Sequence, residues 1–193
     1  MGPGRLEAFS DGVLAIIITI MVLELQVPHE AGLFALLTLW PKLLSYLLSF
    51  VYVGIYWNNH HHIMHAVRNV GGGVLWANLH LLFWLSLLPF TTGWMGENEF
   101  GRWPMIFYGF NLLAAAIAYY VLQRALLARE GKDGLLARAL GGDFKGKISP
   151  LLYAVGIAAA WFDQTGLSLL CYAVTAIMWL VPDRRIERVL AQK

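Results

Sequence analysis

Long apolar stretches are the feature that most limits how this chain can fold. Six of them cover 6–27, 33–57, 74–92, 103–127, 148–162 and 166–181. A helix of about 20 apolar residues crosses a bilayer core about 30 Å thick. Only 13% of the 193 residues are charged, roughly half the share usual in soluble domains. We therefore predict an all-α, polytopic membrane protein with six transmembrane helices in one domain, 1–193.

The basic residues predict how these helices are oriented. With the N-terminus in the cytoplasm, twelve of the fourteen lysines and arginines fall in cytoplasmic segments, as the positive-inside rule requires, and only Lys42 and Arg102 fall elsewhere. Both termini are then cytoplasmic. The twelve are Arg5, Arg68, Arg124, Arg129, Lys132, Arg138, Lys145, Lys147, Arg184, Arg185, Arg188 and Lys193.

The outer segments carry the opposite charge. Their acidic residues either raise the local cation concentration or reflect an ordinary loop composition. These residues are Glu30, Glu97, Glu99 and Asp163.

The first stretch is unusual because acidic residues bracket its apolar part. Twelve residues lie between Asp11 and Glu24, and as a helix they cover about 18 Å, which is less than the hydrocarbon core. Charged groups at membrane depth normally face protein or water. This helix is therefore predicted to stand inside an assembly. The alternative is that tilt and local bilayer thinning accommodate both carboxylates.

One face of the same helix combines aliphatic side chains with a hydroxyl. Ile16, Thr19, Ile20 and Leu23 occur at i, i+3, i+4 and i+7, which places them on one side. Around a central pore, the isoleucines and leucine would form a dewetted constriction, and a threonine ring would partly replace ion hydration. The spacing alone favours the simpler interpretation, in which the stripe is a packing face.

The residues just before this stripe carry a more specific signal. Residues 5–11, Arg-Leu-Glu-Ala-Phe-Ser-Asp, match the pattern R-x-x-x-F-S-D at the start of a first transmembrane helix. This resembles the signature of the transmembrane-protein-175 family, potassium channels of animal endosomes and lysosomes with shorter prokaryotic relatives. Residues 56–61 and 76–90 resemble the second and third helices of that family, more weakly.

The resemblance implies a potassium-selective cation channel that lacks the TVGYG loop of ordinary potassium channels. A chain with one six-helix repeat would form a homotetramer whose first helices line the pore, in the plasma (inner) membrane of a prokaryote. The pore stripe then falls at Ile16, Thr19 and Leu23, with Ile20 adjacent, and Ile16 is the expected hydrophobic gate.

The signature also predicts polar contacts of the first helix. Phe9 offers apolar packing, whereas Arg5, Ser10 and Asp11 offer charge and hydrogen bonds near the cytoplasmic boundary. Capping of the helix by Ser10 or Asp11 is one interpretation. The other is a buried network, because an unpartnered polar group in lipid is costly. The available partners in the third stretch are Asn78, His80 and Trp84, and we expect Ser10 and Asp11 to bond to His80 or Asn78.

A histidine cluster at 60–62 and 65 permits a metal hypothesis. His61 and His65 are four residues apart, a spacing that suits a divalent ion on one helix face. No cysteine accompanies them, and the nearest acidic residues in sequence are remote. A cytoplasmic loop of solvated or bonded histidines is the favoured interpretation, and a response to pH is a further one.

Enzymatic and nucleic-acid functions find no support in the sequence. It contains no G-x-S-x-G, H-E-x-x-H or Walker motif and no nucleic-acid-binding module. The predicted function is a passive, potassium-selective leak channel without a cofactor, with permeant K⁺ in the pore. The alternatives are a proton-coupled secondary transporter using His80, Asp11 and Glu24, and a non-conducting membrane scaffold.

Overall fold

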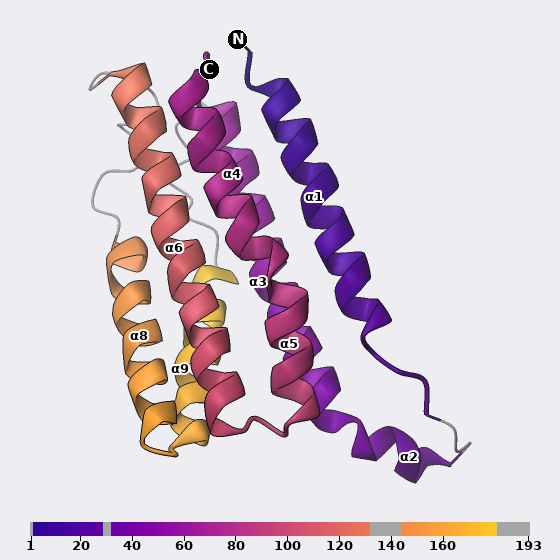
Figure 1. The fold of residues 1–193 in the computed structure, drawn as a ribbon. Helices are drawn as coiled ribbons and strands as arrows, with labels where there is room; N and C mark the ends of the chain where they lie inside the picture. Colours follow the sequence, from indigo (N-terminus) through magenta and orange to yellow (C-terminus); the bar gives the residue numbers. More distant parts are fainter. Residues whose placement is uncertain (1, 29–31, 132–143, 181–193) are drawn as a thin grey trace.

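The fold was obtained as a computed structural model that describes residues 2–28, 32–131 and 144–180, and the regular structure of these segments is entirely helical (Figure 1). Three helical stretches among the described residues are long and apolar enough to cross a membrane: Gly4–Leu23, Gly72–Glu97 and Arg102–Glu130. The helices are α1 (Gly4–Leu23), α2 (Leu33–Thr38), α3 (Trp40–His65), α4 (Gly72–Ser86), α5 (Leu88–Glu97), α6 (Arg102–Glu130), α8 (Phe144–Trp161) and α9 (Thr165–Leu180).

The helix boundaries depart from the predicted stretches mainly where proline begins a new helix. The stretch 33–57 is divided at Leu39, because Pro41 lies in the first turn of α3 and has no N–H for a continuous helix. Pro89 has the same place at the start of α5, so 74–92 is divided at Leu87. α3 also continues past residue 57 to His65, so the prediction of a histidine-containing loop is wrong.

The remaining predicted stretches fall on single helices. α6 and α8 extend a few residues beyond 103–127 and before 148–162, respectively. α9 covers 166–180, and residue 181 lies outside the described residues. α1 ends at Leu23, before the predicted end at residue 27.

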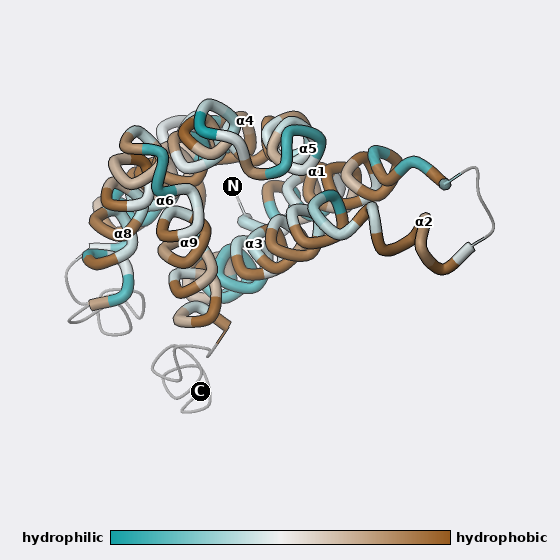
Figure 2. The backbone as a smooth tube through the Cα atoms, turned by 90° about the horizontal axis from the view of Figure 1, so that it is seen from below, coloured by the Kyte–Doolittle hydropathy of each residue, from teal (hydrophilic) through white to brown (hydrophobic). Residues whose placement is uncertain are grey.

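Successive passes of the chain alternate in direction along the bundle (Figure 1). α1 packs against α3, α4 and α5, whereas α6 packs against α4, α8 and α9. Seen along the bundle, α1 lies on the side of α3 and α5, and α2 projects away from the other helices (Figure 2). α1 is therefore a peripheral helix of the single chain.

Charge is distributed unequally between the two ends of this bundle. The start of α1, the end of α3 and the end of α6 share one end (Figure 1). Four of the eight described lysines and arginines belong to these segments or adjoin them: Arg5, Arg68, Arg124 and Arg129. Two more belong to the start of α8, which begins partway along the bundle (Figure 1). The last two are in ion pairs at the opposite end: Lys42 Nζ lies 3.1 Å from Glu97, and Arg102 lies 3.4 Å from Asp163. Glu30 and the six remaining basic residues lie outside the described residues.

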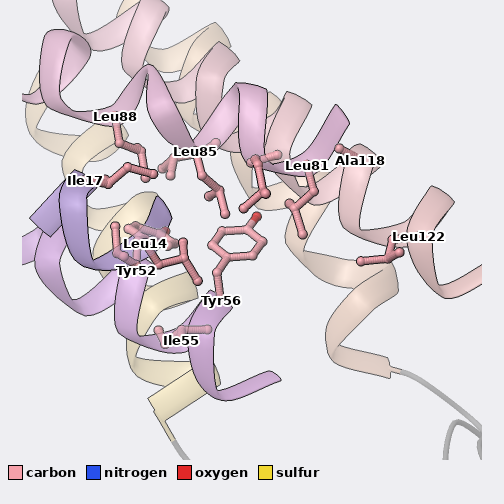
Figure 3. Packing of buried hydrophobic residues seen from close by; sticks show 14 of the residues in the cluster. Leu14, Ile17, Tyr52, Ile55, Tyr56, Leu81, Leu85, Leu88, Ala118 and Leu122 are labelled. Carbon is pink, nitrogen blue, oxygen red and sulfur yellow. The ribbon is translucent and has the colours of Figure 1, made fainter. Parts of the chain in front are cut away.

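A shared apolar core fixes α1 to its neighbours. Leu14 and Ile17 of α1 point toward Tyr52 and Tyr56 of α3 and toward Leu85 of α4 (Figure 3). Each of these side chains is at least nine-tenths buried. Burial of a large apolar side chain contributes about 1.5–3 kcal/mol, so this contact determines which face of α1 is turned inward.

The second half of the bundle packs around a buried tyrosine. The Tyr172 ring of α9 lies directly against Gly109 of α6 and Gly156 of α8, where a Cβ atom at either glycine would meet it. Its hydroxyl donates to the Met105 carbonyl at 3.1 Å, and its own carbonyl accepts from Tyr52 Oη at 2.6 Å. Glycine is required here because the helices approach closely around an aromatic ring.

Candidate functional site

The two faces of α1 have different environments. One face is buried in the chain: Leu6, Ser10, Leu14, Ile17 and Met21. The predicted stripe lies on the other face, where the exposed fractions are 58% for Ile16, 41% for Ile20 and 79% for Leu23. Thr19 is also exposed, and its hydroxyl donates to the Ile16 carbonyl at 2.8 Å. The stripe is therefore not a packing face within the chain.

A directed chain of hydrogen bonds joins three helices at the buried face of α1. Asn78 Nδ2 of α4 donates to Ser10 Oγ at 2.9 Å, and the Ser10 hydroxyl donates to the Leu6 carbonyl at 2.9 Å. Asn78 Oδ1 lies 2.8 Å from His60 Nε2 of α3. Because an amide oxygen only accepts, His60 carries its proton on Nε2. The predicted Ser10–Asn78 bond is confirmed.

His60 belongs to this network although it was not among the predicted partners. Its side chain is 1% exposed, and its Nδ1 has no hydrogen-bond partner among the described residues. His60 follows residue 57, where the predicted second span ends. A pattern in the sequence could have identified His60 as a buried residue. Tyr52, Tyr56 and His60 are spaced four residues apart, so a helix that continues past residue 57 buries His60 on the same side as the two tyrosines.

Asp11 has a different partner from the one expected. Its Oδ1 accepts from Trp57 Nε1 of α3 at 3.0 Å, and the carboxylate is half-buried. His80 does not join α1; its Nε2 accepts from Trp84 Nε1 at 3.0 Å on the same helix, and both groups lie outside the network. Of the two partners expected, Asn78 bonds to α1 and His80 does not, because residues two apart on a helix face different directions. The expected bond of Asp11 to either residue is wrong.

The rest of the signature lies on the exposed side of α1. Arg5 is exposed, and 54% of the surface of Phe9 is accessible. Neither side chain belongs to the network around Ser10. In this motif, Ser10 and Asp11 therefore anchor α1 to the other helices. Arg5 and Phe9 are exposed, as are the residues of the stripe.

Glu7 begins a second line of polar contacts between α1 and α3. Its Oε1 lies 2.8 Å from His61 Nδ1 and 3.4 Å from His65 Nδ1. The two imidazole centroids are 4.1 Å apart. Trp57, His61 and His65 lie along one side of α3 and face Asp11 and Glu7, which are also one helical turn apart. The fold therefore supplies a carboxylate to the predicted histidine pair.

Acidic groups also occur beyond the other end of the stripe. Glu24 directly follows α1, and it lines a groove together with Ile20, Gly93, Trp94 and Glu97. The groove thus places two carboxylates at the end of the bundle opposite the Glu7 cluster. The stripe extends between these two polar regions.

Comparisons with known proteins agree with the sequence signature. A family model described as the endosomal/lysosomal potassium channel TMEM175 matches residues 5–89, which include Ser10, His60 and Asn78. A potassium channel of Chryseobacterium sp. (strain P1-3) is 50% identical over 192 residues and 100% of each chain. The human endosomal/lysosomal proton channel TMEM175 is 36% identical over 112 residues, which are 52% of this chain and 22% of the human one.

A solved structure extends the similarity to the whole fold. It is the crystal structure of a lysosomal potassium-selective channel TMEM175 homolog from Chamaesiphon minutus, matched with a TM-score of 0.79 and 34% identity. The match covers 94% of this chain and 97% of that one. With family motif, full-length sequence similarity and fold in agreement, the chain belongs to the TMEM175 family of ion channels.

Proposed function

We propose that the chain forms a passive, potassium-selective cation channel whose pore is lined by α1 from several copies. The observation that carries this proposal is the exposed stripe on α1. Ile16, Thr19, Ile20 and Leu23 stand on the open face of a helix whose opposite face is anchored by a core and by a polar network. Relatives named potassium channels support the same function.

Each residue of the stripe has a separate role in this proposal. Ile16 forms the hydrophobic constriction, and Thr19 lies about 4.5 Å further along the axis. Because the Thr19 hydroxyl donates its hydrogen to the Ile16 carbonyl, its oxygen lone pairs are free to accept from or coordinate a partner. A ring of such oxygens would replace part of the hydration of K⁺. Conduction of this kind requires no cofactor.

The assembly we propose is a homotetramer with the stripes facing a fourfold axis. One α1 cannot enclose a pore, so copies of the chain must supply the other walls. Assembly would also turn the exposed surface of Ile16 and Leu23 toward the axis and away from lipid. Light scattering of the purified protein in detergent should give the mass of four chains, whereas a monomeric mass would contradict the assembly.

The membrane topology we propose has six spans, with both termini in the cytoplasm of a prokaryotic cell and the spans in its plasma (inner) membrane. Three features support it: the alternating passes (Figure 1), the predominance of basic residues at the end that contains the start of α1, and the pairing of Lys42 and Arg102 with carboxylates at the other end. Cytoplasmic loops are enriched in lysine and arginine.

The transporter alternative requires a proton path through Asp11, His80 and Glu24. The contacts of these residues do not favour it, since Asp11 bonds to Trp57 of α3 and His80 bonds to Trp84 of α4. A channel also differs from a transporter in its flux, which follows the gradient of the permeant ion alone.

Substitution of Ile16 by asparagine tests the proposed gate. The polar amide would wet the constriction, so we expect a larger single-channel conductance and greater permeability to cations other than K⁺. Ile117→Asn on α6 is the matched control, because Ile117 is 49% exposed but lies on another helix. Wild-type conductance and selectivity in Ile16→Asn would remove Ile16 from the gate, as would an equal change in the control.

A further inference from the structure

Three side chains with metal-binding atoms converge where α1 begins and α3 ends. They are Glu7 from α1 and His61 and His65 from α3, and one ligand atom from each lies within 4.8 Å of those of the other two. The side chains are 18%, 41% and 52% exposed, respectively, so the cluster is partly shielded but accessible from solution. The two histidines are adjacent on the helix surface because they are four residues apart.

We propose that Glu7, His61 and His65 form a binding site for a divalent transition-metal ion such as Zn²⁺. One carboxylate with two imidazoles is an established ligand set for zinc, with a fourth position left for water. The site would connect the first two turns of α1 to the last turn of α3.

The distances between the ligand atoms suit this ion. Zinc–nitrogen and zinc–oxygen bonds of about 2.0–2.2 Å in a tetrahedral site separate neighbouring ligand atoms by about 3.3 Å. Glu7 Oε1 lies 2.8 Å from His61 Nδ1 and 3.4 Å from His65 Nδ1. The ligand atoms of His61 and His65 lie within 4.8 Å of each other, so side-chain rotations would bring the three groups around one ion.

Metal binding would replace hydrogen bonds that the ligands make in its absence. His61 Nδ1 bonds to Glu7 Oε1, and His65 Nδ1 lies 3.1 Å from the His61 carbonyl, to which it donates. Neutral imidazoles that bind metal through Nδ1 carry their hydrogen on Nε2. The Trp57 ring stacks on His61 with a centroid distance of 6.0 Å and restricts its rotation.

A bound ion would replace the Glu7–His61 hydrogen bond and so strengthen one of three polar connections between α1 and the rest of the chain. The other two are the Ser10–Asn78 and Asp11–Trp57 bonds, which lie within one turn of Glu7. An effect of the bound ion on conduction rests on the proposed function, because α1 must line the pore. Binding itself does not, so the two are tested separately.

The test is the thermal unfolding and calorimetric titration of the purified, tag-free, full-length protein in mild detergent, with ZnCl₂ as the probe. We expect saturable binding of one ion per chain and a rise in Tm that follows occupancy, because an ion that binds only the folded state stabilises it. MgCl₂ at the same concentrations should leave Tm unchanged, since Mg²⁺ prefers an all-oxygen site.

Substitutions then locate the site. Glu7→Gln and His65→Gln should each weaken zinc binding by at least about tenfold, since loss of an outer-shell partner alone weakens metal sites by that amount. His80→Gln, which removes an exposed histidine of α4 that bonds to Trp84, should bind zinc like the wild type. Absence of saturable binding in the wild type, unchanged affinity in Glu7→Gln and His65→Gln, or equal loss in His80→Gln would overturn the proposal.

Discussion

The buried contact between Ser10 and Asn78 allows the anchoring of α1 to be measured in isolation. The perturbation is a double-mutant cycle that combines Ser10→Ala with Asn78→Leu. Both side chains are fully buried, and the 2.9 Å bond between them joins α1 to α4. The cycle separates the energy of this bond from the other effects of each substitution.

The contacts predict that the two single variants differ in cost. Ser10→Ala leaves Asn78 Nδ2 without its acceptor, and the Leu6 carbonyl stays within the helix, so we expect a loss of about 1 kcal/mol in the free energy of unfolding. Asn78→Leu also removes the acceptor of the His60 Nε2–H. Because His60 Nδ1 already lacks a partner among the described residues, this variant should lose about 2–3 kcal/mol.

The assay is unfolding by sodium dodecyl sulfate from mild detergent micelles, followed by circular dichroism. We expect a coupling energy of about 1 kcal/mol, which lies within the range of interhelical hydrogen bonds in membrane proteins. Thr175→Val is the control, because among the described residues this buried hydroxyl bonds only to the Cys171 carbonyl of its own helix. Additivity of the two substitutions within about 0.3 kcal/mol, or an equal loss in Thr175→Val, would show that the Ser10–Asn78 bond does not anchor α1.

Two further predictions concern selectivity and helix packing. Thr19→Ala should lower the preference for K⁺ over Na⁺ while Thr19→Ser retains it, because only the hydroxyl oxygen is used; equal reversal potentials in all three proteins would contradict this role. Gly156→Ala should destabilise the fold by about 1–3 kcal/mol through overpacking against Tyr172, measured as a fall in Tm. Gly166→Ala, which meets nothing within 4 Å, should not lower Tm, and equal melting of the two variants would argue against close packing.

Local patterns in the sequence predicted much of the site. The i, i+3, i+4, i+7 spacing placed Ile16, Thr19, Ile20 and Leu23 on one face, and the structure shows that face exposed. Pairing of Ser10 with Asn78 followed from the cost of burying polar groups in lipid. Both predictions depend on short-range periodicity or on general energetics, which a single sequence contains.

The predictions failed where a polar composition hid a helical spacing, and where residues distant in sequence come into contact. The polar run after residue 57 was interpreted as a loop, although the buried positions Tyr56, His60 and Met64 continue at helical spacing. His80 and Asn78 were both named as partners of α1, although residues two apart on a helix face different directions. The approach of Glu7 to His61, across 54 positions in sequence, depends on how α1 packs on α3.

The reversal potential of the purified protein in a planar bilayer or liposome shows whether an α1-lined pore conducts potassium selectively. With K⁺ on one side opposed by Na⁺ on the other, we expect a current whose reversal potential lies near the potassium equilibrium value. A reversal potential near zero would contradict selectivity, and a flux that requires a proton gradient would contradict the channel mechanism.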